Sequence, residues 1–483
     1  GEAEQAQVIE QARQLELRQQ QQDDPDILPR VERTDIPASM PDLSWQEQQA
    51  GSLRLTRYTQ GTNGLVYQQV IAPLPALSAQ QLSLLPLYTN VLTELGTAGA
   101  DYLTTQQRQS ATVGAINAFT TMRGEIDDEQ RLRANFVLSS KALARSAAAQ
   151  TALMRDTLDS PRFDEHSRIR ELISQQRSRR EQAVTGNGHG LAMAAACAGM
   201  SPLARLNHEL SGLAGITSLR TLDTSLMDAG ALAQFADQLA TLHQAVCAMP
   251  RQLLTIADEQ HIDGIASDTL AAWREPQSRG DLPGFALPAQ RHCVNQLWVA
   301  NTQVNFCARA YPTVTVEHSD AAALVVLGGF LRNGFLHRAI REQGGAYGGG
   351  ATQDSGIAAF RFYSYRDPRL EGTLEDFDAS LRWLLDTRHE ARALEEAVLG
   401  VIGGMDKPSS PAGEAKQHFH NRLFGRSHAQ REAFRQRVLD VSLEDLRRVC
   451  ETYLLPERAS TAVMTNASQS GVADCLGLER IEV

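Results

Sequence analysis

Hydrophobic and polar residues alternate along two runs from about Leu53, in SLRLTRYTQGTNGLVYQQVIAPL. The turn-forming residues 61–64 separate the runs, a pattern typical of a β-hairpin. A helix is predicted next over LSAQQLSLLPLYTNVLTELGT, with Ser78 as its N-cap and Gly96 as its stop. Longer helical segments are predicted near residues 127–155, 160–184 and 228–260.

A similar order of elements returns after the loop PQSRGDLPGFALP, which marks a boundary near 275–290. Strand-like NQLWVANTQVNFCARAY precedes the helical run DAAALVVLGGFLRNGFLHRAIREQ and then strand-like AAFRFYSYRDP. The helices predicted after it lie near 373–405, 411–437 and 442–453, and a strand over ASTAVMTN closes the pattern. Both bodies are predicted to be α+β domains of similar length, which indicates an internal repeat.

The first residues differ from both bodies. Residues 2–22 form a polar helical pattern, and prolines at 29, 37 and 41 predict an extended linker after it. We therefore expect a helix and linker over 1–44 and domains over 45–275 and 285–483. The chain begins with Gly1 and without an apolar leader, so it is expected to be a fragment or a processed product.

Composition narrows the class of protein. With 483 residues, 42% hydrophobic and 21% charged, the chain is typical of a multi-domain globular protein. The sequence contains no run of about 18 apolar residues, so we predict no membrane span. The net charge of −11 argues against a duplex nucleic-acid binder. The six cysteines form no CxxC pair, so we expect buried thiols in a reducing compartment.

The motifs of common hydrolases are missing from the sequence. HExxH and its inverse would place two imidazoles and a general base on one helix face, but His208, His389 and His166 each lack the second histidine. No GxSxG or GxxxxGK[ST] motif occurs. His418 and His420 are two positions apart, so on a helix they would not share a face. Two interpretations remain open, a surface or partly buried pair without a ligand and a metal site.

Two glycine-rich stretches remain. We expect GNGHG at 186–190 to be a flexible surface loop, with contact to an extended substrate as the alternative. In REQGGAYGGG, Arg341 lies in the last helical turn, Gly344 and Gly345 end the helix, and Tyr347 begins an extended segment. Arg341 and Tyr347 are hydrogen-bond donors suited to a peptide carbonyl or an oxyanion. The alternative is a helix C-cap with Tyr347 packed in the core.

The run LRNGFLHRAIREQGGAYGGGATQDSGIAAFRFYSYRDPRLEGTLEDF resembles the C-terminal half of presequence proteases, peptidasomes of the pitrilysin and insulinase clan of zinc metallopeptidases. The flanking segments QLWVANTQVNFCARAYP, LEEAVLGVIGGMDKPSSPAGEA, LPRVERTDIPASMP and LPLYTNVLTELGTAGADY are similar to the same family. The resemblance therefore covers nearly the whole chain.

The resemblance implies four α+β domains in two halves that close around a chamber. It implies zinc bound by HxxEH and a distal Glu in the N-terminal half, and no cofactor in this chain. The resemblance also implies that Arg341 and Tyr347 bind the substrate, together with Gly344, Gly345 and Ala346 between them. The first domain is expected to be a degenerate copy of the catalytic domain, with Leu87, Asn90 and Val91 where its ligands and glutamate would lie.

As a result, the expected activity is zinc-dependent degradation of unfolded peptides by the full-length protein, with this chain inactive alone. Its expected partners are the N-terminal catalytic half and unfolded peptides, with no nucleic acid or membrane. A separately encoded, non-catalytic binding subunit is the main alternative. A small-molecule enzyme using His418 and His420 is another. The resemblance implies a cytoplasmic location for a bacterial source and a mitochondrial or plastid one for a eukaryotic source.

Overall fold

The computed structural model describes residues 1–20, 31–274 and 283–483, which divide into two compact units. The first unit, residues 1–39, contains the helix α1 (Glu2–Gln20) and a short 3-10 turn (Arg33–Asp35). The helix agrees with the polar pattern predicted for residues 2–22; residues 21 and 22 and the linker residue Pro29 lie outside the described residues. No helix in the described part of the chain is long and apolar enough to cross a bilayer.

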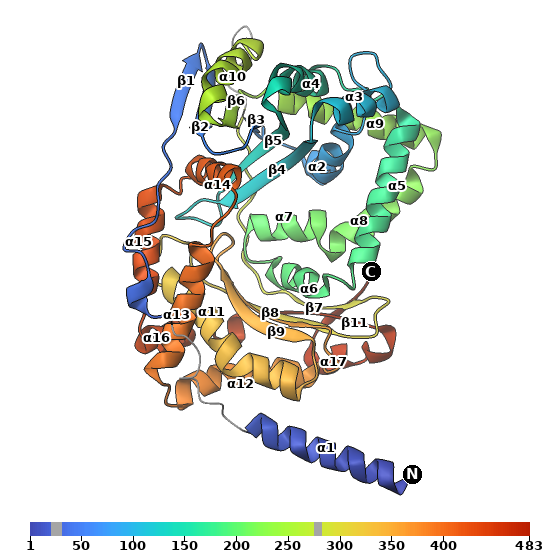
Figure 1. The fold of residues 1–483 in the computed structure, drawn as a ribbon. Coiled ribbons are helices and arrows are strands. Elements are labelled where there is room, and N and C mark those ends of the chain that lie inside the picture. The colour runs from blue at the N-terminus through green and yellow to red at the C-terminus, as the bar shows by residue number, and fades with distance from the viewer. Residues whose placement is uncertain (21–30, 275–282) are drawn as a thin grey trace. The chain divides into compact units, whose positions relative to one another are not determined.

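The second unit, residues 40–483, contains two mixed α/β domains (Figure 1). The sheet of the first domain has the strand order β1-β2-β6-β3-β5-β4. Its strands are β1 (Gln46–Ala50), β2 (Leu53–Thr59), β3 (Leu65–Pro73), β4 (Ala115–Gly124), β5 (Leu132–Leu143) and β6 (Gln252–Ala257). Its helices are α2 (Ala79–Leu92), α3 (Tyr102–Thr112), α4 (Ala147–Asp159), α5 (His166–Ala183), α6 (Gly188–Cys197), α7 (Pro202–Ser211), α8 (Leu213–Ser225), α9 (Ala229–Cys247) and α10 (Glu259–Ala272).

Three local predictions in this domain are wrong. The strands β2 and β3 do not pair with each other, because β6 lies between them, parallel to β2 and antiparallel to β3. The helix predicted near 127–155 contains the strand β5 before α4 begins, and the one predicted near 228–260 contains β6 after α9 ends. Both missed strands are largely buried inside the sheet, so their apolar runs lack the alternation of a half-exposed strand.

The second domain has the strand order β12-β7-β11-β8-β10-β9. Its strands are β7 (Asn295–Val299), β8 (Phe306–Pro312), β9 (Gly348–Asp354), β10 (Ala359–Tyr365), β11 (Ser460–Thr465) and β12 (Glu479–Glu482). Its helices are α11 (Ala321–Leu331), the π-helical η4 (Arg332–Gln343), α12 (Glu371–Asp386), α13 (Ala391–Met405), α14 (Pro411–Leu423), α15 (His428–Leu439), α16 (Leu443–Tyr453) and α17 (Val472–Leu476). Here the predicted strand regions and the helix over 320–343 agree with the structure, but the two helices predicted near 373–405 and 411–437 are each interrupted, so that each range contains two helices.

The two sheets share one topology over five strands, since β2-β6-β3-β5-β4 and β7-β11-β8-β10-β9 follow the same order. The sixth strand comes from opposite ends of this unit, β1 in the first sheet and β12 in the second. The predicted fold class, two homologous α/β-sandwich domains of the insulinase type, is therefore confirmed. The exact domain boundaries at 45–275 and 285–483 remain a prediction.

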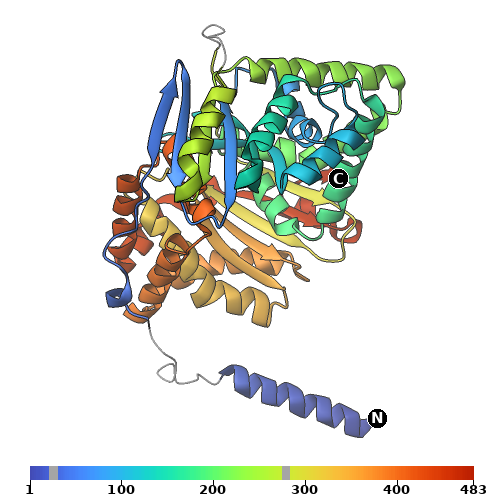
Figure 2. The same cartoon turned by 45° about the horizontal axis from the view of Figure 1, so that its top comes forward.

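Each domain covers one face of the other domain's sheet with a helix (Figures 1 and 2). The helix α14 packs Ala415 and Phe419 against Ile71 and Val137 of the first sheet. The helix α6 packs on β8, β10 and β11 of the second sheet. The expectation of a flexible loop at GNGHG is wrong, because α6 begins at its buried Gly188. The two domains thus form one packed unit.

Only some of the cysteines are buried. Cys197, Cys307 and Cys450 are buried, and burial raises the pKa of each thiol to about 12. Cys293 and Cys475 are exposed, so the prediction of buried thiols is wrong for these two.

A buried histidine links three helices of the first domain. The Tyr88 hydroxyl donates to Nδ1 of His243 at 2.9 Å, and Nε2 of His243 donates to the Leu158 carbonyl at 2.9 Å. Burial lowers the pKa of His243 to about 4. The unfolded chain, with a histidine pKa near 6.5, therefore takes up this proton first, and stability is lost as pH falls from about 6.5 towards 4.

We expect His243→Gln to remove part of this pH dependence, because the amide does not titrate. Between pH 7 and pH 5 the free energy of unfolding of the unchanged chain should fall by on the order of 1–2 kcal/mol more than that of the variant. Urea unfolding at both pH values measures the difference. Identical pH dependence in the two proteins would contradict the assignment.

Candidate functional site

The segment REQGGAYGGG connects a helix to the edge strand of the second sheet. The helix α11 continues without a break into η4, and Arg341 lies in the last turn of η4. Gly345 adopts φ +80°, a conformation that favours glycine. The amides of Gly345 and Ala346 donate to the carbonyls of Arg341 and Ile340, both at 3.1 Å, and so satisfy two carbonyls at the helix end. This local geometry agrees with the predicted helix stop.

Tyr347 lies where the chain enters the sheet. Its amide donates to the Tyr365 carbonyl at 3.0 Å, and β9 then pairs with β10 in an antiparallel register. The strand β9 is the last in its sheet, so its other edge has no strand partner among residues 1–20, 31–274 and 283–483. An unpaired strand edge offers backbone groups to which an extended peptide can add.

Arg341 and Tyr347 lie next to each other on the surface. The Arg341 guanidinium carbon is 5.6 Å from the centre of the Tyr347 ring, and Tyr347 is 65% exposed. The alternative in which Tyr347 packs in the core is therefore wrong. Neither polar group makes a hydrogen bond or ion pair with any residue that the structure describes, so their donors face solvent. The site thus presents a charged donor and a neutral donor side by side.

The glycines serve two purposes. A Cβ at Gly344 would overlap the Arg369 guanidinium, and a Cβ at Gly349 would come within 2.8 Å of Ile340. These two glycines are required by packing inside the domain. At Gly348, by contrast, no atom lies within 4 Å of the position a Cβ would take, so this backbone is open to an approaching chain.

The loop after β10, in which Asp367 is buried between exposed neighbours, holds the glycine turn in place. The Asp367 side chain accepts from the Arg369 amide at 3.0 Å and from the Thr373 hydroxyl at 2.7 Å, and burial raises the pKa of this carboxyl. Arg369 in turn donates to Asp376 at 2.7 Å and to the Ala339 carbonyl at 3.2 Å. Sequence reasoning did not assign these residues a role, although FYSYRDP is the segment that contains Asp367.

The two histidines of α14 do not come together as a site. His418 contacts the Tyr58 hydroxyl through Nδ1 at 2.8 Å and Asp42 through Nε2 at 3.1 Å. Nε2 of His420 donates instead to the Gln69 side chain at 2.9 Å, and burial lowers its pKa to about 4. The pair is partly buried and structural, as the first of the two interpretations predicted.

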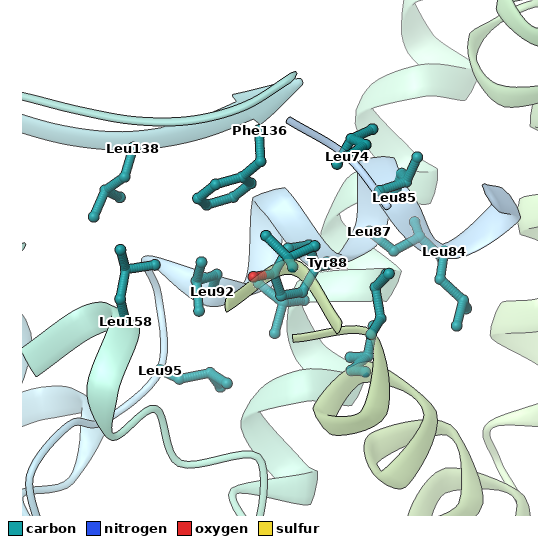
Figure 3. Close-up of a cluster of buried hydrophobic side chains, with 14 of the residues drawn as sticks. Leu74, Leu84, Leu85, Leu87, Tyr88, Leu92, Leu95, Phe136, Leu138 and Leu158 are labelled. Atoms are coloured by element: carbon teal, nitrogen blue, oxygen red, sulfur yellow. The ribbon is translucent and has the colours of Figure 1, made fainter. Parts of the chain in front are cut away.

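The helix α2 occupies the position where the resemblance would place zinc ligands in a catalytic domain. Leu87 is buried there with Tyr88 and Leu92 in the apolar core of the first domain (Figure 3). Val91 is buried in the same core. Asn90 offers one amide, whose buried oxygen accepts no hydrogen bond from any residue that the structure describes. No group of three histidine, cysteine or acidic side chains close enough to hold a metal ion occurs in the described part of the chain. These residues do not fit a zinc ion.

Comparison with known proteins identifies relatives over nearly the whole sequence. Residues 1–222 match the family model of the region associated with peptidase family M16, subfamily C, and residues 295–459 match the PreP C-terminal domain. The mitochondrial presequence protease of Yarrowia lipolytica is 27% identical over 470 residues, covering 96% of this chain and 47% of the relative. That of Danio rerio is 28% identical over 470 residues, covering 92% and 45%. The chain spans about half the length of these relatives.

Solved structures show the same fold at low identity. A conserved protein from Enterococcus faecalis V583 superposes with a TM-score of 0.65 at 12% identity, covering 88% of this chain and 99% of that one. The peptidase M16 inactive domain from Pseudomonas fluorescens does so with a TM-score of 0.61 at 16% identity, covering 88% and 98%. These likenesses show the fold alone. The matches of residues 1–222 and 295–459 to the two family models, with the relatives that cover more than 90% of the sequence, show that the chain belongs to the presequence protease family, within subfamily C of the M16 peptidases, and corresponds to its C-terminal portion.

Proposed function

We propose that this chain is the substrate-binding half of a zinc metalloendopeptidase that degrades unfolded peptides in a closed chamber. The observation that carries the proposal is the exposed pair of Arg341 and Tyr347 at the start of the edge strand β9. Relatives that match this chain are named presequence proteases, which fits a peptide as the ligand.

Arg341 and Tyr347 donate hydrogen bonds to carbonyl oxygens of the peptide, at or next to the scissile bond. The guanidinium carries a permanent charge and several N–H donors, so it binds most strongly to an oxygen that gains negative charge during attack. The Tyr347 hydroxyl adds a neutral donor beside it. Because the glycine turn and the Asp367 loop hold both residues in place, little reorganisation is needed when the peptide binds.

The free edge of β9 supports the same ligand. A peptide added to this edge would be held mainly by main-chain hydrogen bonds, which are independent of side-chain identity. Open space beside Gly348 gives its backbone a route to the strand. We therefore propose broad specificity for extended, unfolded peptides rather than for one sequence.

The zinc of the proposed enzyme belongs to the half with which this chain is paired. Residues Leu87, Asn90 and Val91 supply no ligand set, so this chain contributes binding and orientation. The partner is the N-terminal half of the same polypeptide. The relative from Yarrowia lipolytica is named a mitochondrial presequence protease, and the one from Arabidopsis thaliana a chloroplastic/mitochondrial presequence protease. We propose these compartments for a eukaryotic source and the cytoplasm for a bacterial one.

The experiment uses the purified 483-residue chain with a fluorescein-labelled, unstructured peptide of about 20 residues. We expect saturable binding by fluorescence anisotropy, because the donors and the strand edge are already formed. Mass spectrometry after incubation with zinc should show intact peptide. An absence of binding would contradict the proposed substrate site.

A further inference from the structure

His189 lies against the tyrosines of the second domain although it belongs to the first. It is the second residue of α6, and its ring is 4.8 Å from the Tyr365 ring and 5.7 Å from the Tyr363 ring, centre to centre. Tyr365 also contacts Tyr347, at 5.5 Å. A Cβ at Gly188 would come within 2.6 Å of Phe306 and Met464, so the glycine lets α6 approach this closely. The packing therefore brings His189 beside the candidate peptide site.

The His189 imidazole has no polar partner in the described part of the chain. Its Nδ1 atom is shielded from solvent without a hydrogen bond, whereas Nε2 is not shielded in this way. Burial lowers the pKa of His189, which favours the neutral ring at neutral pH. An N–H group buried without an acceptor costs free energy, so we assign the proton to Nε2. The ring then presents one neutral donor on its accessible side.

We infer that His189 is a further peptide-binding residue, which donates from Nε2 to a backbone carbonyl of the peptide bound at Arg341 and Tyr347. His189 belongs to the first domain, whereas Arg341 and Tyr347 belong to the second. The site therefore receives donors from both domains. Among the described residues, no side chain of either domain competes for the Nε2 proton of His189. A neutral donor suits an amide carbonyl, whose charge is partial.

The spacing fits an extended peptide. Ring-to-ring steps of 4.8 Å and 5.5 Å separate His189 from Tyr365 and Tyr365 from Tyr347. His189 and Tyr347 are therefore within about 10 Å of each other, a length that about three residues of an extended chain span. A peptide bound at Tyr347 can therefore reach His189 within about three residues.

This inference rests on the proposed function, and one set of variants separates the two. His189→Phe keeps a ring against the tyrosines and removes the donor, whereas His189→Gln retains an N–H donor. We expect His189→Phe to weaken binding of the labelled 20-residue peptide about five- to tenfold, and His189→Gln to recover most of the loss. His292→Phe, at an exposed histidine before β7, is the matched control and should bind as the unchanged chain does.

The outcomes are distinct. If Arg341→Ala weakens binding and His189→Phe does not, the inference fails and the proposed function stands. If neither variant weakens binding, the proposed site itself is wrong. Long-range ¹H–¹⁵N spectra give a readout that a purely structural role would not change: we expect a protonated Nε2 whose signal shifts on peptide addition. An unshifted signal at saturating peptide would overturn the contact.

Discussion

Arg341→Ala is expected to lower kcat/KM for peptide hydrolysis about 100-fold in the protein that joins this chain to a zinc-binding half. Removal of one preorganised donor from a transition state typically costs about 3 kcal/mol. The Arg341 side chain is exposed and makes no hydrogen bond with a described residue, so its loss should leave stability unchanged. The measurement is cleavage of a quenched fluorescent peptide, with thermal unfolding as the test of folding.

The matched control is Arg338→Ala, which removes an exposed arginine from the same π-helical segment. We expect kcat/KM within about threefold of the unchanged enzyme. Tyr347→Phe completes a double-mutant cycle with Arg341→Ala. Because the two side chains are stacked at 5.6 Å, their effects should not be additive. Unchanged kcat/KM in Arg341→Ala would remove the role proposed for this residue.

Phe419→Ala is expected to lower the free energy of unfolding by about 3–5 kcal/mol. The Phe419 side chain is 4% exposed and lies between α14 of the second domain and the first sheet. Its truncation therefore leaves a cavity in the contact that joins the two domains. Urea unfolding followed by circular dichroism measures the change.

The control for this prediction is Leu103→Ala on α3, whose side chain is 54% exposed. Exposed substitutions of this kind usually change stability by no more than about 0.5 kcal/mol. Because each domain contributes a helix to the other's sheet, we also expect one cooperative transition for the unchanged chain. A loss below about 1 kcal/mol in Phe419→Ala would show that the contact contributes little.

The sequence predicts local structure better than the pairing of distant segments. The Ser78 N-cap and the helix stop at Gly344 and Gly345 depend on neighbouring residues, and both are observed. The strand β6, by contrast, lies about 180 residues after β3 and yet separates β2 from β3, which no local pattern signals. The same limit applies to α14, which was predicted as a helix but whose partner sheet no local pattern signals. The helix α6 was not predicted, because its first residues were interpreted as a loop.

The candidate site shows the same division. The order of Arg341, the glycines and Tyr347 is readable in the sequence, and the turn forms as expected. Whether Tyr347 is exposed or buried depends on packing at the edge of the second sheet, so spacing alone left both possibilities open. Substrate contact by GNGHG was one of two interpretations, but the sequence could not place His189 beside Tyr365, because that contact requires the docking of two domains.

A crystal structure of this chain bound to an unstructured peptide would show directly whether Arg341 and Tyr347 bind the peptide backbone. We expect an extended peptide beside β9, with its carbonyl oxygens within hydrogen-bond distance of the Arg341 guanidinium and the Tyr347 hydroxyl. A peptide bound elsewhere on the chain, with both of these groups in contact only with solvent, would contradict it.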